Sequence, residues 1–166
     1  SKGHRKAKGV HIIIEYPQSW KRAEGLRPNV VQRFSRKAQG GRSIQCILLI
    51  KKMPLLTRLF EDDLFTPEFM NGLVKKIGGE CLRWGKTQIE GENTGWMVLK
   101  MDAERAGIKI TAYVLQYMII HKHRWVQIQF MVGGLRNDPY TSELFDSCFP
   151  LFQAMANTII LPDKWR

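Results

Sequence analysis

Two neighbouring segments in the second half of the chain show the alternation of apolar and polar residues that is typical of β-strands. In segment 125–132 every second residue from Val126 is apolar, and Gln127 and Gln129 lie between them. This period of two predicts a strand with one face in the core and a wetter opposite face. Segment 108–120 also alternates and then ends in a continuous apolar run, which predicts a central strand covered on both faces.

The four residues between these segments are His121-Lys122-His123-Arg124, so the region predicts a long β-hairpin with a basic tip. Two histidines at this spacing could form a metal pair on an extended chain, but a turn would break their alignment. The sequence places no cysteine or carboxylate beside them, and the two cations would repel a metal ion. We interpret the tip as exposed, with a secondary anion contact that gains charge as the histidines titrate below neutrality.

The same patterning predicts five further strands and two helices. The strands are expected at 10–15, 30–35, 44–52, 81–90 and 95–103. The first helix begins at Thr66-Pro67-Glu68, where a capping hydroxyl precedes a proline and a carboxylate that favours the helix dipole. Gly78-Gly79 ends this helix.

A closing helix carries apolar residues from Phe145 to Ile159 along one side. Pro150 falls on its opposite face and predicts a kink or a second helix start near Cys148. Strands joined by short turns pair antiparallel, and both helices must bury their apolar sides against the sheet. The sequence therefore predicts an α+β fold, a mostly antiparallel sheet of about seven strands sandwiched by two main helices. It disfavours a doubly wound parallel sheet with a ligand crevice.

The chain of 166 residues has the length of one domain. We expect a single domain over 10–166, preceded by a basic N-terminal tail at 1–9. No apolar run approaches the ~20 residues that span a bilayer. Because the three cysteines are far apart and follow no disulfide or zinc spacing, we interpret Cys46, Cys81 and Cys148 as small buried hydrophobes.

Positive charge is concentrated in the first third of the chain. Residues 1–58 hold 14 lysines and arginines against Glu15 and Glu24, a net charge of +12, whereas the remainder has −1. This asymmetry predicts attraction to polyanions or anionic lipid, and its alternative is a solvated face with a flexible basic tail. The candidate anion-binding residues are Lys2, Arg5, Lys6, Lys8, Lys21, Arg22, Arg33, Lys122 and Arg124.

Two tryptophans are candidates for aromatic contacts with a ligand. Trp20 precedes a pair of cations and Trp125 follows Arg124. Stacking beside positive charge is how proteins bind single-stranded nucleic acid. The alternative is that each indole closes an edge of the core.

Other reactive patterns predict no site when their spacing is considered. Segment 79–87 resembles a phosphate-binding loop, but it has five residues between its glycines instead of four and a helix before it. Glu61-Asp62-Asp63 lacks the spacing of a calcium loop and is explained by the helix start that follows it. Asp138, Ser142, Ser147 and Cys148 include nucleophiles without a catalytic signature. We therefore expect no catalytic residue, no metal and no cofactor.

Three features resemble the PsbP-like superfamily, which contains an extrinsic photosystem protein and small secreted or lipoprotein-type bacterial proteins. They are Tyr16-Pro17-Gln18-Ser19-Trp20, the hairpin at 108–132, and Pro150-Leu151-Phe152 followed by Ala156-Asn157-Thr158-Ile159. The resemblance covers most of the chain after residue 9. It implies an antiparallel sheet with helices on both faces, a non-enzymatic role and frequently an exported location. The basic first third departs from the family pattern.

These observations leave two functional hypotheses. The first is a non-enzymatic binding or accessory protein of the bacterial cell envelope, periplasmic or exported, that holds a protein or small ligand. The alternative is a protein that binds nucleic acid or anionic membrane through its basic N-terminal third, with an affinity that falls steeply as salt rises. An enzyme would need a deep pocket with convergent titratable groups. The start at Ser1 is compatible with a removed leader, so the compartment stays open, as does the oligomeric state.

Overall fold

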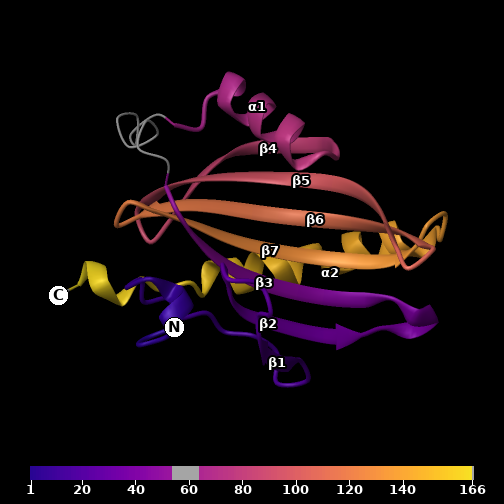
Figure 1. The fold of residues 1–166 in the computed structure, drawn as a ribbon, viewed down its shortest axis with the longest axis horizontal. Coiled ribbons are helices and arrows are strands. Elements are labelled where there is room, and N and C mark those ends of the chain that lie inside the picture. Colours follow the sequence, from indigo (N-terminus) through magenta and orange to yellow (C-terminus); the bar gives the residue numbers. More distant parts are fainter. Residues whose placement is uncertain (54–63, 166) are drawn as a thin grey trace.

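The computed structural model describes residues 1–53 and 64–165, and within them seven strands form one antiparallel sheet. The sheet has the order β1-β2-β3-β7-β6-β5-β4 (Figure 1). Its strands are β1 (Lys21–Glu24), β2 (Val30–Lys37), β3 (Ser43–Lys52), β4 (Glu80–Ile89), β5 (Glu92–Arg105), β6 (Ile108–His121) and β7 (Arg124–Leu135). The two α-helices are α1 (Pro67–Ile77) and α2 (Tyr140–Asn157), with short 3₁₀ turns at Arg5–Ala7, Gln39–Gly41 and Pro162–Lys164. The predicted α+β fold is confirmed.

The sheet consists of two meanders joined by one long pairing. Strands β1 to β3 follow each other as neighbours, and so do β4 to β7. The junction is the antiparallel pair of β3 and β7, which runs in register from Ser43 opposite Gly133 to Lys52 opposite Arg124. The long β6–β7 hairpin closes at Lys122 and His123, whose positive φ angles of 51° and 54° give the turn a twist that suits a two-residue hairpin.

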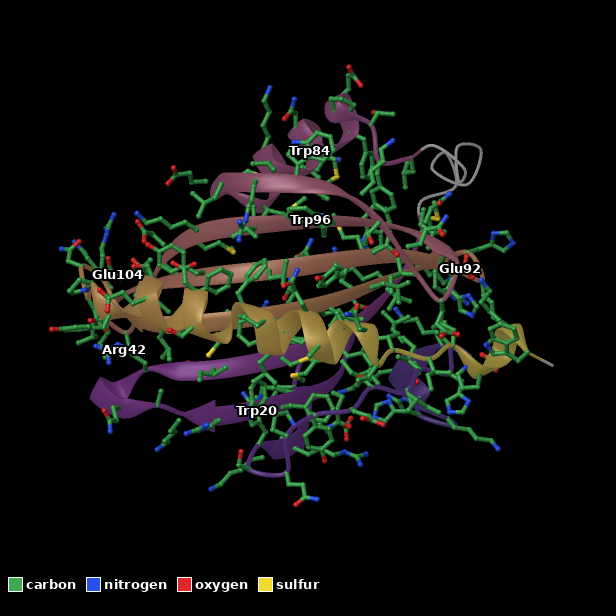
Figure 2. The ribbon with its side chains drawn as sticks, turned by 180° about the vertical axis from the view of Figure 1, so that it is seen from behind. Trp20, Arg42, Trp84, Glu92, Trp96 and Glu104 are labelled. Atoms are coloured by element: carbon green, nitrogen blue, oxygen red, sulfur yellow. The ribbon has the colours of Figure 1, made fainter. Side chains whose placement is uncertain are left out.

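Each face of the sheet carries one helix and one apolar core. Helix α2 lies across one face, in front of the sheet in Figure 2, and packs Phe145, Phe152 and Met155 into the larger core. Phe152 stacks on Phe130 of β7 at a ring distance of 5.2 Å, and both rings are fully buried. Helix α1 covers part of the opposite face, where Met70 is buried in the second core. The apolar residues that alternate along β7 therefore face the larger core beneath α2.

The strand predicted at 10–15 is wrong, and one of the two alternatives for the closing helix is excluded. Segment 10–15 forms only an isolated bridge between Ile13 and Ile160, because it runs along the C-terminal end of the chain rather than along the sheet. The edge strand on the N-terminal side of the sheet is β1, which the sequence did not predict because this four-residue segment has no buried residue and no apolar–polar alternation. Pro150 lies exposed within α2, and the helix continues through it to Asn157, which excludes the second helix start but not the alternative of a kink.

The basic N-terminal segment packs against the sheet instead of forming a flexible tail. Ala7 is buried in the larger core. Lys8 Nζ donates to Asn29 Oδ1 at 2.8 Å and to the Ile50 carbonyl at 3.1 Å. Lys6 Nζ donates to the Gly25 carbonyl and pairs with Glu24. These contacts tie residues 1–9 to the β1–β2 turn and to the end of β3.

The three cysteines differ in how deeply they are buried. Cys46 is fully buried, as predicted, whereas Cys81 and Cys148 are half-buried. Among the described residues, neither α-helix has the length and apolar content that would take it across a bilayer.

Candidate functional site

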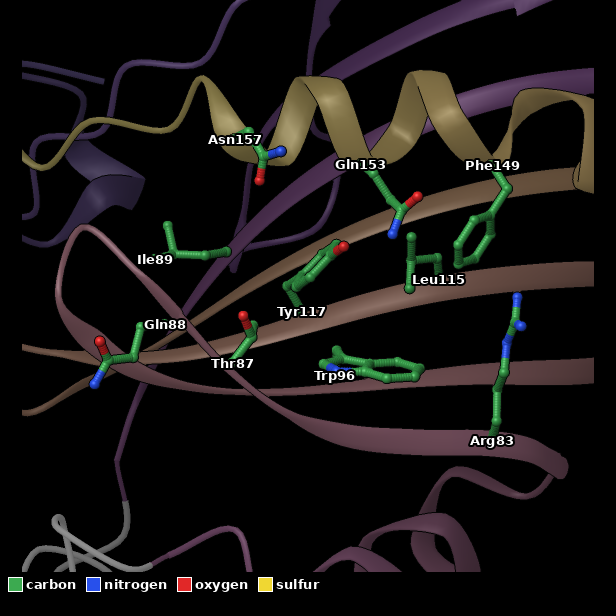
Figure 3. Close-up of a pocket in the computed structure, with 10 residues that line it drawn as sticks. All are labelled: Arg83, Thr87, Gln88, Ile89, Trp96, Leu115, Tyr117, Phe149, Gln153 and Asn157. Carbon is green, nitrogen blue, oxygen red and sulfur yellow. The ribbon is translucent and has the colours of Figure 1, made fainter.

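A cleft of about 330 Å³ lies between α2 and strands β4 to β6 (Figure 3). It exists because α2 packs over β6 and β7, which leaves the same face of β4 and β5 without a helix above it. Edge strand β4 forms one side and α2 forms the other. The cleft is therefore a product of the sheet order, which puts β4 at the margin.

The floor of the cleft is a row of residues from three adjacent strands. Gly85 pairs with Trp96, which in turn pairs with Tyr117. A Cβ atom at Gly85 would lie 2.8 Å from the Trp96 indole, closer than carbon atoms approach. Glycine at this position therefore leaves room for the Trp96 indole against the edge strand.

The two sides carry polar groups that face each other. On α2, Phe149, Gln153 and Asn157 recur every four residues and so share one helix face. On β4, Arg83 and Thr87 lie on the same face as Gly85. The Arg83 guanidinium carbon lies 4.6 Å from the centre of the Phe149 ring, a cation–π contact that spans the cleft at this end.

The chemistry of the lining is aromatic and amide-rich. Among the described residues that line the cleft, Arg83 is the only charged one, and none is a carboxylate, histidine, cysteine, lysine or serine. Burial raises the pKa of Tyr117, so its hydroxyl stays protonated near neutral pH. The cleft thus offers neutral hydrogen-bonding groups, aromatic faces and one cation.

The predicted anion-binding residues do not form one site. Lys2, Arg5, Lys21, Arg22, Arg33 and Lys122 are exposed, whereas Lys6, Lys8 and Arg124 are half-buried. Lys122 pairs with Asp163 at 3.1 Å. Lys8 lies near the charges of Arg124, Lys51 and Lys52, and the last two were not among the predicted residues.

Both tryptophan candidates are buried. Trp20 is 5% exposed and Trp125 is 8% exposed. The Trp125 ring packs against Phe69 at 5.7 Å between ring centres and against Phe65 at 6.3 Å. Their position fits the alternative that each indole closes an edge of the core, and neither presents a face for stacking.

The hairpin tip is less exposed than its sequence suggests. His121 is buried, and its Nδ1 lies 3.0 Å from Glu92 Oε1. The sequence near the histidines has no carboxylate, but β5 brings Glu92 next to β6 from 29 residues away. Within the described residues, no three acidic, histidine or cysteine side chains are placed to hold a metal.

The other reactive patterns have structural roles where they are described. Segment 79–87 runs through strand β4 and opens no helix. Asp138 binds Arg42, and the hydroxyls of Ser142 and Ser147 donate to carbonyls within α2 or just before it. Glu61-Asp62-Asp63 lies outside the described residues.

Comparisons with known proteins identify a fold but no family. No family model matches the chain, and no curated protein matches it. LpqN of Mycobacterium tuberculosis, described as involved in cell envelope biogenesis, is similar in structure with a TM-score of 0.51 and 14% identity. The match covers 89% of this chain and 81% of LpqN. The resemblance to the PsbP-like superfamily stays a prediction.

A second solved structure is a protein of unknown function, PA94, from Pseudomonas aeruginosa. It matches with a TM-score of 0.47 and 11% identity, over 90% of this chain and 96% of its own.

Proposed function

We propose that this chain is a non-enzymatic binding protein that holds a small amphipathic ligand in the cleft between α2 and β4. The proposal rests on the residues that line the cleft. Trp96 and Tyr117 form its floor, side-chain amides lie on its rim, and Arg83 is the one charge among these described residues. Small-molecule sites are typically concave, mostly apolar and fitted with a few polar groups, and they measure about 300 to 1,000 Å³. A ligand with an apolar or aromatic body and one anionic or polar group fits this arrangement.

The lining supports binding rather than catalysis. General acid–base work needs a group that exchanges a proton near neutral pH, and covalent catalysis needs an activated nucleophile. An arginine guanidinium is not such a group, because arginine stays charged in proteins. Thr87 has no base beside it among the lining residues, and the raised pKa of Tyr117 keeps its hydroxyl neutral.

We place this binding role in the cell envelope as part of the same proposal. LpqN, which shares the fold, is described in terms of cell envelope biogenesis. An exported, periplasmic setting also follows from the resemblance to PsbP-like proteins.

The aromatic sulfonate 1-anilinonaphthalene-8-sulfonate is a suitable probe, since it combines aromatic rings with one anionic group. Isothermal titration should give saturable binding of one equivalent. Arg83→Gln removes a charge-assisted contact worth about 1.5 to 3 kcal/mol, so we expect affinity to fall roughly 10- to 100-fold. Trp96→Ala should also weaken binding.

Arg36→Gln is the matched control, because Arg36 is exposed and does not line the cleft. The proposal is wrong if the probe binds both cleft variants as tightly as it binds the control. The proposal is also wrong if the folded wild-type protein shows no saturable binding of the probe.

A further inference from the structure

Lysine and arginine side chains gather at the end of the sheet where β3 stops and β7 begins. Lys52 lies opposite Arg124 in the register of the two strands, and Lys51 lies opposite Trp125. Lys8 joins them from the N-terminal segment, because its ammonium group bonds the Ile50 carbonyl. We call Lys8, Lys51, Lys52 and Arg124 the basic end.

The charges of the other three cations act on Lys8, and among the described residues none of the four pairs with a carboxylate. Burial, and then the charges of Arg124, Lys52 and Lys51, lower the pKa of Lys8. In residues 1–53 and 64–165, no ion pair connects any of the four to an acidic side chain. Strands β2, β3, β6 and β7 contain no aspartate or glutamate. Four adjacent strands therefore contribute no acidic side chain to the basic end.

An exposed apolar tip lies next to the basic end. Leu26 in the β1–β2 turn is 95% exposed and is followed by exposed Arg27. The turn is anchored on both sides, since Lys6 bonds the Gly25 carbonyl and Lys8 bonds Asn29 Oδ1. The same lysine that joins the basic end thus also holds the turn that presents Leu26.

We propose that the basic end and Leu26 dock this protein on the surface of an anionic lipid bilayer. Cations near such a surface gain about 1 kcal/mol each from its negative potential. An apolar side chain beside them gains further by leaving water for the boundary between headgroups and acyl chains. Nucleic acid fits less well, because stacking needs an exposed aromatic ring, and Trp125, which lies opposite Lys51 in the basic end, is buried.

Vesicle cosedimentation tests the proposal with the whole chain. Wild-type protein should bind vesicles of phosphatidylcholine and phosphatidylglycerol at seven to three, and should not bind pure phosphatidylcholine. Each cation removed should lower partitioning about fivefold. The double variant Lys51→Gln/Lys52→Gln should therefore bind roughly 25-fold less. Leu26→Ser should reduce binding to the anionic vesicles severalfold, although it leaves the charge of the protein unchanged.

The matched control is Lys75→Gln/Lys76→Gln, which removes two adjacent exposed lysines from the end of α1. It should bind anionic vesicles like the wild-type protein, and circular dichroism should show that all variants are folded. Equal losses in the two double variants would mean that net charge alone acts, and would overturn the proposal. So would tighter binding to single-stranded or duplex DNA than to the anionic vesicles, with no effect of Leu26→Ser on either ligand.

Discussion

Arg42 and Asp138 form a two-point ion pair between residues 96 positions apart in the chain. Arg42 Nε lies 2.6 Å from Asp138 Oδ2, and Arg42 Nη2 lies 2.8 Å from Oδ1. Asp138 Oδ2 also accepts from the Thr141 hydroxyl at 3.0 Å. The carboxylate therefore connects the start of β3 with the first turn of α2, the helix that forms one side of the cleft.

This pair should make stability depend on pH. Hydrogen bonding to Arg42, supported by Thr141, lowers the pKa of Asp138 below its unfolded value of about 3.9. Since the folded-state pKa is depressed, the stabilisation is present above pH ~4 and is lost as pH falls through the folded-state pKa. We expect Asp138→Asn to be less stable than wild type in urea at pH 7, with a difference that shrinks below pH ~4. If the stability difference between wild type and Asp138→Asn stayed constant down to pH 2, the ion pair with Arg42 would not be its cause.

Removal of the Phe152 ring should be among the most damaging single changes. Phe152→Ala leaves a cavity against Phe130 in the larger core, so the free energy of unfolding should fall by about 3 to 5 kcal/mol. Leu151→Ala, one residue away and 37% exposed, is the control and should cost less than about 1 kcal/mol. Urea titrations followed by circular dichroism compare the two variants. Equal losses of unfolding free energy in the two variants would mean that α2 does not turn Phe152 into the core and Leu151 toward solvent.

Helix α1 should respond in opposite directions to two substitutions. Thr66 Oγ1 accepts a hydrogen bond from the Phe69 backbone amide at 3.2 Å, so Thr66→Ala should destabilise the protein by about 1 kcal/mol. Gly72 is exposed inside the helix, and a Cβ atom there would meet nothing within 4 Å. Gly72→Ala should therefore stabilise by roughly 0.5 to 1 kcal/mol, as the shift in urea midpoint would show. Stabilisation by both changes would refute the assigned cap.

The three thiols should differ in reactivity. Burial raises the pKa of Cys46, which leaves almost no thiolate in the folded protein. Cys81 and Cys148 are half-buried, and burial raises the pKa of each thiol as well. A disulfide exchange reagent at pH 8 should label these two slowly and label Cys46 only after unfolding. Mass spectrometry of peptides identifies each site, and early labelling of Cys46 would contradict its burial.

Local patterning was enough to predict most of the architecture. The alternation in β6 and β7 and the Thr66 cap of α1 depend on neighbours a few residues apart, and all appear in the structure. Strand β1 was missed because pairing with β2 holds it, while its own side chains remain outside the core. The segment at 10–15 is apolar because Ile12 is buried, not because it belongs to the sheet.

The cleft depends on contacts that no local pattern contains. Trp96, Tyr117 and Gln153 belong to three elements, and only the position of β4 at the sheet margin brings them around one space. The one local signal was Gly85 in the middle of a strand-like segment, where a glycine often marks a close approach by another group. Glu92 beside His121 was hidden for the same reason, since it arrives through the β5–β6 pairing.

The pairing of β3 with β7 also has a kinetic consequence. Every other neighbour pair in the sheet joins consecutive strands, whereas this one joins Lys52 to Arg124 and closes a long loop. Contacts between distant residues slow folding, because the loop entropy is lost before the contact forms. The β4–β7 meander should therefore assemble early. Docking of the N-terminal meander along β7 should then be the slow event that completes the native state.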